Sequence, residues 1–182
     1  MMMNLANGVF LDVDTLGDDV DRHALAEVLP SWQWRHAASR IPVFDAVRNA
    51  DVIVTNKVLL SAAVLEHCTT RLRLICIAAT GTNNVDLEAA SRRGVVVCNV
   101  RGYATASVVQ YVFSVMLNLV TRLDDYREHV RRGEWSRSPH FSLLREPITE
   151  LSGKTLGIIG YGTLGKAVAA AARIFDMKVL VA

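Results

Sequence analysis

The segment GYGTLG at 160–165 is the part of the sequence whose residue types and spacing best match a defined chemistry. It has the GxGxxG pattern, with an apolar run before it and a helix-forming run after it, which is the context of a dinucleotide-binding turn. Gly160 permits the tight strand-to-helix turn, Gly162 lets a pyrophosphate approach the backbone, and Gly165 allows the helix to pack closely on the strand. The segment therefore predicts a dinucleotide site.

The start of the following helix supports the same chemistry. The exposed N–H groups of Thr163 and Leu164, together with the helix dipole, favour a diphosphate. The pattern also expects an acidic residue about 20 positions further on, which binds the adenosine ribose. The sequence ends within the predicted strand Lys178–Ala182, before any such residue, so NAD and NADP both stay open. A glycine-rich turn without a ligand is the alternative interpretation.

Histidines and cysteines form no recognisable site. The histidines are isolated from one another, and none shares a motif with a carboxylate that general acid–base catalysis would need. The cysteines are odd in number, with no CxxC pair, which argues against a disulfide framework and favours a reducing, cytoplasmic compartment. No His, Cys or carboxylate cluster has metal-ligand spacing. We therefore assign no catalytic and no metal-binding residue.

Composition excludes several classes of protein. The 182 residues are 51% hydrophobic, which argues against a disordered chain. Twenty basic and eighteen acidic residues give a net charge of +2, too balanced for a protein whose main partner is nucleic acid. The N-terminus lacks the pattern of a signal peptide, and the apolar stretch Val108–Val120 is too short to span a bilayer. We expect a soluble globular protein.

Short β-rich runs alternate with helical segments over residues 1–99, which predicts βαβ units and a parallel sheet of about five strands. The predicted strands are Gly8–Leu11, Trp32–Ala37, Asp51–Thr55, Leu72–Ala79 and Gly94–Val100. The predicted helices are Asp21–Leu29, Pro42–Asn49, Ser61–His67 and Asp86–Arg93, the last capped by Asp86 and ended by Gly94.

Residues 103–134 predict one long helix, capped by Thr105 or Ser107, with an apolar stripe and a charged end. Such a helix bridges two domains or packs on another chain; an ordinary core helix with a solvated end is the alternative. Residues 135–150 have loop character. A second α/β unit then begins, with a strand at Thr155–Gly160, a helix from Thr163 and a strand at Lys178–Ala182.

Four segments carry a family resemblance: TNKV at 55–58, ATGTNNVDLEAASRRGVVVCNVRGYATASVVQ at 79–110, GEWSRSP at 133–139, and GKTLGIIGYGTLGKAVA at 153–169. In this order and spacing they resemble the N-terminal part of the D-isomer-specific 2-hydroxyacid dehydrogenases. The sequence is most similar to the branch of glycerate dehydrogenase and hydroxypyruvate reductase.

The resemblance implies two α/β domains. Residues 1–99 would form the N-terminal segment of a flavodoxin-like, parallel-sheet substrate domain. Residues 100–182 would form the first part of a Rossmann NAD(P)-binding domain, with the boundary near Asn99–Gly102. The helix around 103–132 resembles the helix through which the family forms homodimers.

The resemblance also implies where ligands bind. A substrate carboxylate would meet the backbone of a glycine-containing loop and of the loop after the preceding strand, at Ala79, Thr80, Gly81, Thr82, Asn56 and Lys57. These loops follow predicted parallel strands, whose carboxyl ends are the usual ligand sites. A solvated Lys57 and a simple turn at Gly81 are the alternatives. Thr105 matches a position beside the nicotinamide, with helix capping as its alternative.

The implied reaction moves a hydride between the nicotinamide of NAD or NADP and C2 of a small anionic 2-keto or 2-hydroxy acid. Hydroxypyruvate/glycerate and glyoxylate/glycolate are the implied pairs. The family's catalytic Arg, Glu or Asp, and His match nothing up to Ala182, so we expect them beyond it and expect these 182 residues alone to be inactive. The alternatives are an NADH-sensing binding module and a non-catalytic truncated homologue that interacts through the long helix.

Overall fold

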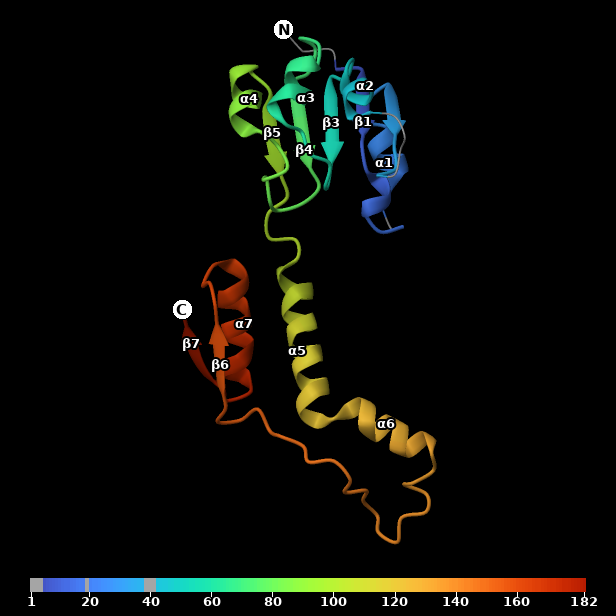
Figure 1. Ribbon diagram of the computed structural model, residues 1–182, viewed down its shortest axis with the longest axis vertical. Helices are drawn as coiled ribbons and strands as arrows, with labels where there is room; N and C mark the ends of the chain where they lie inside the picture. The colour runs from blue at the N-terminus through green and yellow to red at the C-terminus, as the bar shows by residue number, and fades with distance from the viewer. Residues whose placement is uncertain (1–4, 19, 38–41) are drawn as a thin grey trace. The chain divides into compact units, whose positions relative to one another are not determined.

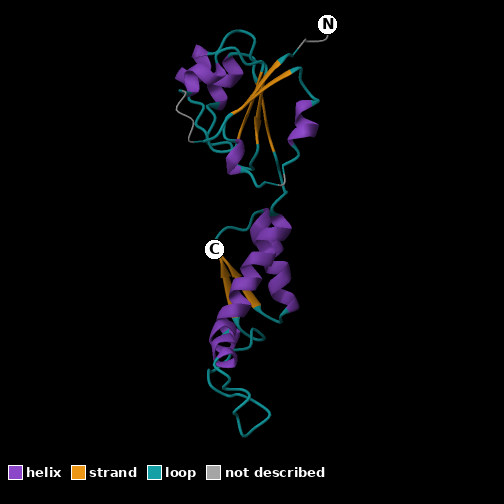
Figure 2. Cartoon of the chain, turned by 90° about the vertical axis from the view of Figure 1, so that its right-hand side faces the viewer, coloured by secondary structure: helices purple, strands orange, loops and turns teal. Residues whose placement is uncertain are grey.

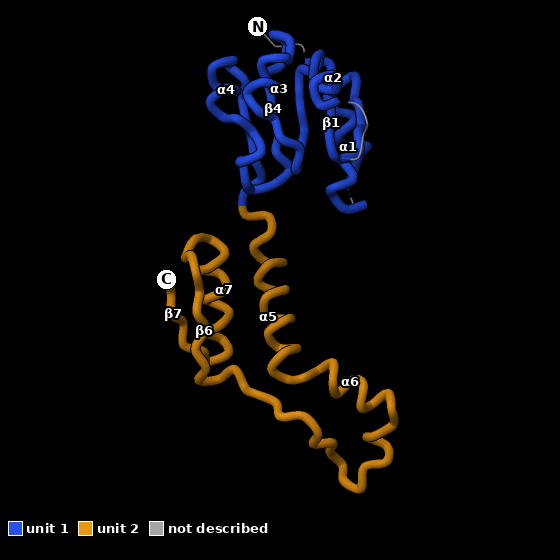
Figure 3. The backbone as a smooth tube through the Cα atoms, in the orientation of Figure 1, with its two compact units in different colours: residues 1–101 blue, residues 102–182 orange. Residues whose placement is uncertain are grey.

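A computed structural model describes residues 5–18, 20–37 and 42–182. The chain forms two compact units, residues 1–101 and 102–182 (Figure 3). Each unit has its own buried apolar core.

The first unit is built on a five-stranded parallel sheet in the order β2-β1-β3-β4-β5 (Figure 1). This is the strand order of the flavodoxin-like doubly wound fold, so the predicted fold class is confirmed. The strands are β1 (Asn7–Phe10), β2 (Ser31–Trp34), β3 (Val52–Thr55), β4 (Leu74–Ile77) and β5 (Val96–Asn99). The strands β3, β4 and β5 lie within the predicted ranges. β1 begins and ends one residue earlier than predicted, and β2 begins one residue earlier and ends three residues earlier.

Helices lie on both sides of this sheet (Figure 2). The main core joins one face of the sheet to α2 (Val43–Val47), α3 (Ala62–His67) and α4 (Leu87–Arg92). Leu25 of α1 (Arg22–Ala26) faces the opposite side, where it lines an apolar hollow with Phe10 and Val54. A short 3₁₀ helix, η1 (Val13–Thr15), follows β1.

In the first unit, aspartate caps and a glycine that can be located in the sequence mark the ends of two helices. The Asp86 carboxylate accepts a 2.9 Å hydrogen bond from the N–H of Ala89, which confirms the predicted cap of α4. Gly94 adopts φ +66° just past the end of that helix, a conformation that favours glycine. The Asp21 carboxylate accepts from the N–H groups of His23 and Ala24 and starts α1 in the same way.

The second unit contains α5 (Thr105–Thr121), α6 (Leu123–Arg131), β6 (Thr155–Ile158), α7 (Thr163–Ile174) and β7 (Lys178–Val181). Strands β6 and β7 pair in parallel, joined by α7. Its core is formed by Phe113, Leu151, Ala172 and Met177, and the rings of Phe113 and Phe175 stack with centroids 5.3 Å apart. Helix α5 therefore packs against the strand-helix-strand unit, and residues 135–150 form neither helix nor strand, as predicted.

The prediction of one long helix over 103–134 is wrong. The helix breaks at Arg122, which has φ 55° and ψ 38°, and α5 and α6 meet at an angle of 59°. The carbonyl of Val120 accepts from the N–H of Thr149 at 2.8 Å, and the Asp124 carboxylate accepts from the Asn118 side chain at 2.9 Å. The Thr149 N–H thus takes a carbonyl that would accept from the N–H of residue 124 in a continuous helix, and the side-chain contact links the two helices across the break.

The predicted caps of α5 are also wrong. Its N-cap is Ala104, and no side chain caps the helix. Thr105 lies one position inside the helix, and the Ser107 hydroxyl donates back to the Ala104 carbonyl at 3.1 Å. No single helix of the described residues is long and apolar enough to cross a membrane; α5 and α6 reach that length and composition only when the bent pair is counted together.

Candidate functional site

Two loops meet at the carboxyl ends of β3 and β4. The N–H of Ala78 donates to the carbonyl of Thr55 at 2.8 Å, which continues the pairing of the strands into the loops. The Asn84 side-chain amide donates to the carbonyls of Asn56 and Val58 at 3.4 and 3.3 Å. The structure therefore brings the 56–57 loop and the 79–82 loop together at one edge of the sheet.

The 79–82 loop presents backbone donors. Within the described part of the chain, the N–H groups of Ala79, Thr80, Gly81 and Thr82 donate to no hydrogen-bond acceptor. The loop is held instead through other atoms. The Thr80 hydroxyl donates to the carbonyl of Val100 at 3.0 Å, and the Asn99 side chain donates to the carbonyl of Thr80 at 2.7 Å. Consecutive backbone N–H groups of this kind can bind an anion.

Asp12 organises the neighbouring loop. Its side chain is fully buried, and its carboxylate accepts from the backbone N–H groups of Asn56 at 2.9 Å, Lys57 at 2.5 Å and Val58 at 3.2 Å. The Asn56 side-chain amide donates to the Thr15 hydroxyl at 2.9 Å. These backbone and amide donors are thus used inside the fold. On this loop the exposed Lys57 ammonium is the group that can meet an anion.

Sequence reasoning missed Asp12. The signal that could have found it is its position: it follows β1, which pairs with β3, so both strands end at the same edge of the sheet. A buried carboxylate must be hydrogen-bonded, and the loop after β3 supplies the donors.

The glycine turn has the close contacts that its spacing predicts. Gly160 adopts φ +90° between β6 and α7. A Cβ atom at Gly165 would collide with the carbonyl oxygen of Gly160 and lie 3.3 Å from Cγ2 of Ile158, so only glycine allows this approach. At Gly162 a Cβ would have no atom within 4 Å. The turn is thus closed where helix and strand pack and open where a ligand would approach.

The first turn of α7 supplies backbone donors beside this open position. Thr163 and Leu164 begin the helix, so their N–H groups have no partner within it. Thr105, the contact predicted beside the nicotinamide, is the first residue of α5 and is half-buried. Helix α5 packs on α7 in the same unit, but no hydrogen bond of the Thr105 side chain is seen among the described residues.

A polar cluster joins α6 to the loop that follows it. His129 lies between two carboxylates, with Nδ1 3.2 Å from Glu134 and Nε2 3.4 Å from Glu146. Glu134, and to a lesser degree Glu146, raises the pKa of the His129 imidazole, while His129 lowers the pKa of the Glu134 carboxyl. Arg145 also pairs with Glu134 at 3.2 Å. This cluster holds the loop on the helix.

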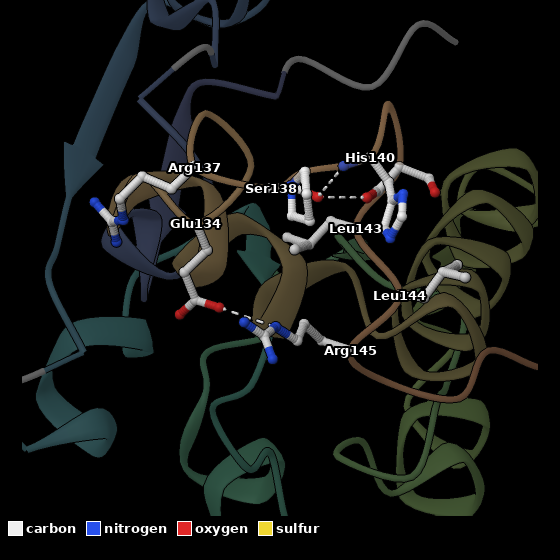
Figure 4. Close-up of a pocket in the computed structure, with 9 residues that line it drawn as sticks. Glu134, Arg137, Ser138, His140, Leu143, Leu144 and Arg145 are labelled. Atoms are coloured by element: carbon white, nitrogen blue, oxygen red, sulfur yellow. Dashed lines mark hydrogen bonds and ion pairs between the residues drawn. The ribbon is translucent and has the colours of Figure 1, made fainter.

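Beside this cluster lies a hollow of about 370 Å³, lined by Glu134, residues 137–140 and residues 142–145 (Figure 4). Its charged groups are already engaged: Arg145 pairs with Glu134, and Arg137 donates to the carbonyl of Arg132 at 2.7 Å. None of the predicted ligand contacts lines it. Over the described ranges, no group of three His, Cys, Asp or Glu residues could hold a metal ion.

Both glycine-containing loops lie in the part of the chain that matches a known protein family. The protein-family model of the D-isomer specific 2-hydroxyacid dehydrogenase catalytic domain matches residues 13–176 of this chain. The chain belongs to this family. The predicted resemblance is thereby confirmed.

Relatives within the 2-hydroxyacid dehydrogenases share moderate identity with the chain. Glycerate dehydrogenase of Methylorubrum extorquens is 38% identical over 176 residues, which cover 94% of this chain and 54% of the relative. Hydroxypyruvate reductase of Blautia hydrogenotrophica is 36% identical over 138 residues, which cover 76% and 42%. The chain thus spans about half the length of these relatives.

The fold is also similar to that of a solved structure. D-lactate dehydrogenase from Aquifex aeolicus, solved with NAD and lactic acid, has a TM-score of 0.75 and 28% identity, and the match covers 96% of this chain and 50% of that one. These comparisons establish homology to NAD(P)-dependent 2-hydroxyacid dehydrogenases.

Proposed function

We propose that this chain supplies substrate-binding and coenzyme-binding parts of an NAD(P)-dependent oxidoreductase acting on a small 2-hydroxy or 2-keto acid. Residues 1–99 are assigned to the substrate domain and 100–182 to the coenzyme domain. The observation that carries the proposal is the glycine turn, which is open at Gly162 and closed at Gly165. A turn that served packing alone would need glycine at the closed position and not at the open one.

The coenzyme is proposed to bind through its pyrophosphate. The N–H groups of Thr163 and Leu164 and the positive end of the α7 dipole stabilise the phosphate charge. Gly160 sets the turn, Gly162 leaves room for the phosphates, and Thr105 is assigned to the nicotinamide end. When bound, the nicotinamide supplies hydride exchange.

The substrate carboxylate is proposed to bind the N–H groups of Ala79, Thr80, Gly81 and Thr82, with the Lys57 ammonium adding positive charge. Asn56 is the least direct of the proposed contacts, because its amide and backbone N–H are bonded to Thr15 and Asp12. The names of the relatives support hydroxypyruvate/glycerate or glyoxylate/glycolate as the acid. We assign no general acid or base within residues 1–182 and propose that it lies in the part of the relatives that this chain does not match.

The experiment is a titration of the 182-residue chain with NADH and with NADPH, followed by the fluorescence of the reduced nicotinamide. Gly162→Val should weaken binding at least about tenfold, or about 1.4 kcal/mol, with the melting temperature unchanged. Gly157→Val is the matched control, since Gly157 lies in β6 and a Cβ there also meets nothing within 4 Å. Equal binding by Gly162→Val and the control, or no binding by the wild-type chain, would contradict the proposal.

A homodimer through residues 103–132 is also proposed. On α5 the side chains of Tyr111, Val115 and Leu119 recur every four residues and are 70%, 40% and 69% exposed, which leaves an apolar stripe uncovered. Leu119→Glu should shift the sedimentation coefficient from dimer to monomer. Ala170→Glu, on an exposed position of α7, should not. A wild-type chain that sediments as a monomer would contradict this part.

The alternative is a binding module that senses NADH without turnover. The proposed coenzyme contacts at Thr163 and Leu164 support it, because they would bind the dinucleotide whether or not a hydride is transferred. This alternative predicts that NADH changes the sedimentation of the chain. It also predicts that a longer form of the protein, which includes a counterpart of the half of the relatives that this chain does not match, does not oxidise NADH with hydroxypyruvate. Turnover by that longer form would exclude the alternative.

A further inference from the structure

Two cysteines face each other across neighbouring strands. Cys76 of β4 and Cys98 of β5 are directly opposite in the parallel register. The residues before them, Ile75 and Val97, are also opposite and pack into the core beneath α2, α3 and α4. Since successive side chains of a strand point to opposite faces, both cysteines lie on the other face of the sheet.

The register places the Cα atoms of the two cysteines at a separation that a disulfide can bridge. Neighbouring strands are about 4.8 Å apart, which lies inside the Cα separation of about 4.4–6.8 Å found in disulfides. Cys98 is exposed and Cys76 is half-buried, and both are free thiols in this structure. The third cysteine, Cys68, is buried on the core side, and its thiol donates to the carbonyl of Val64 at 3.4 Å.

We propose that Cys76 and Cys98 are a modification site that forms a reversible cross-strand disulfide by exchange with a low-molecular-weight disulfide such as oxidised glutathione. The Cys98 thiolate attacks one sulfur of the oxidant and expels the first thiolate. The Cys76 thiolate then attacks Sγ of Cys98, forms the protein disulfide and expels the second. The two protons lost by the cysteines are taken up by the two leaving thiolates, so the oxidant is reduced to two thiols.

The environment sets the order of these steps. The thiolate is the attacking form in exchange reactions, and burial, together with the adjacent Cys98, raises the pKa of the Cys76 thiol. The raised pKa lowers the thiolate fraction of Cys76, which also lines the apolar hollow of the first unit. The exposed Cys98 meets the oxidant first, and Cys76 acts as the resolving cysteine.

The disulfide would tie β4, which leads into the 79–82 loop, to β5, which ends beside that loop. Ala79 follows β4, and its carbonyl accepts from the N–H of Val100, which follows β5, at 3.0 Å. A link between Cys76 and Cys98 would fix the spacing of these strands just before that loop. Any effect on substrate binding rests on the proposed function, whereas formation of the disulfide does not.

The experiment treats the native 182-residue chain with oxidised glutathione at pH 8, traps remaining thiols with an alkylating reagent, and measures intact mass and a tryptic map. The expected product is a single chain that has lost two hydrogen atoms and carries at most one alkyl group, on Cys68, and in which peptides 74–92 and 94–101 are joined. Dithiothreitol should restore both thiols. The same treatment in urea should instead give mixed pairings that include Cys68.

Variants separate this result from other thiol chemistry. Cys76→Ser should stop with one glutathione attached to Cys98, and Cys98→Ser should react far more slowly. Cys68→Ser, the matched control, should form the same link as the wild type. A wild-type chain that keeps a stable glutathione adduct on Cys98, links two chains, or pairs either cysteine with Cys68 in native buffer would overturn the proposal.

Discussion

The Asp51 carboxylate is a buried charge whose removal should destabilise the first unit by a calculable amount. Its side chain is 3% exposed at the start of β3. Arg71 donates to it twice, from Nε at 2.8 Å and Nη2 at 3.0 Å, and the N–H groups of Ala6 and Asn7 donate at 2.8 and 2.9 Å. All four contacts favour the ionised carboxylate.

Arg71 is the main reason that the pKa of Asp51 falls from 3.8 to about 2. At 1.36 kcal/mol for each pKa unit, this lowering corresponds to roughly 2.4 kcal/mol in favour of the folded, ionised state. Because the Arg71 side chain is 54% exposed, solvent screens part of the interaction. We therefore expect Asp51→Asn to lower the free energy of unfolding by about 1–2 kcal/mol at pH 7.

The pH dependence gives the prediction its sharpest test. A carboxylate whose pKa is lower in the folded state stabilises the protein above the unfolded pKa, near 4, and this stabilisation is lost as the pH falls toward 2. Urea unfolding of wild type and Asp51→Asn, followed by circular dichroism, should show a deficit at pH 7 and 5 that shrinks by pH 3.

Arg71→Gln is the matched control for this pair. It should raise the pKa of Asp51 toward its ordinary value, and the double variant should be less destabilised than the sum of the two single variants. An Asp51→Asn deficit of the same size at pH 7 and pH 2.5, or additive single effects, would refute the assignment of the stabilisation to this ion pair.

Two other side chains lead to direct predictions. Asp12→Ala removes the acceptor of three backbone N–H groups. The free energy of unfolding, measured by urea titration, should therefore fall by about 2–4 kcal/mol. A decrease below about 0.5 kcal/mol would contradict that role. Glu134 and Glu146 raise the pKa of His129 in the folded protein. The protonated imidazole therefore stabilises the folded state fully below pH 6.5, the unfolded pKa, and this stabilisation is lost as the pH rises through the folded pKa. The melting temperature of the wild type should therefore fall more between pH 6 and pH 9 than that of His129→Gln. Parallel curves for the two proteins would contradict this prediction.

Patterns within a few residues determined much of the fold. Apolar runs separated by helical segments predicted the five parallel strands of the first unit, because strand and helix periodicity are local properties. Asp86 and Gly94 marked the ends of one helix, and the glycine spacing marked the turn before α7. Each depends on the chain's immediate neighbours, and the structure reproduces each.

Contacts between distant parts of the chain required the tertiary structure. The Val120 carbonyl is taken by Thr149, and this contact across the loop helps break a helix that periodicity alone extends past Arg122. Asp12 meets a loop 44 residues further on. Cys76 and Cys98 become opposite only through the register of β4 and β5. Sequence spacing does not encode strand register or the partner of a buried carboxylate; these are set when the sheet assembles and every buried polar group must find a hydrogen bond.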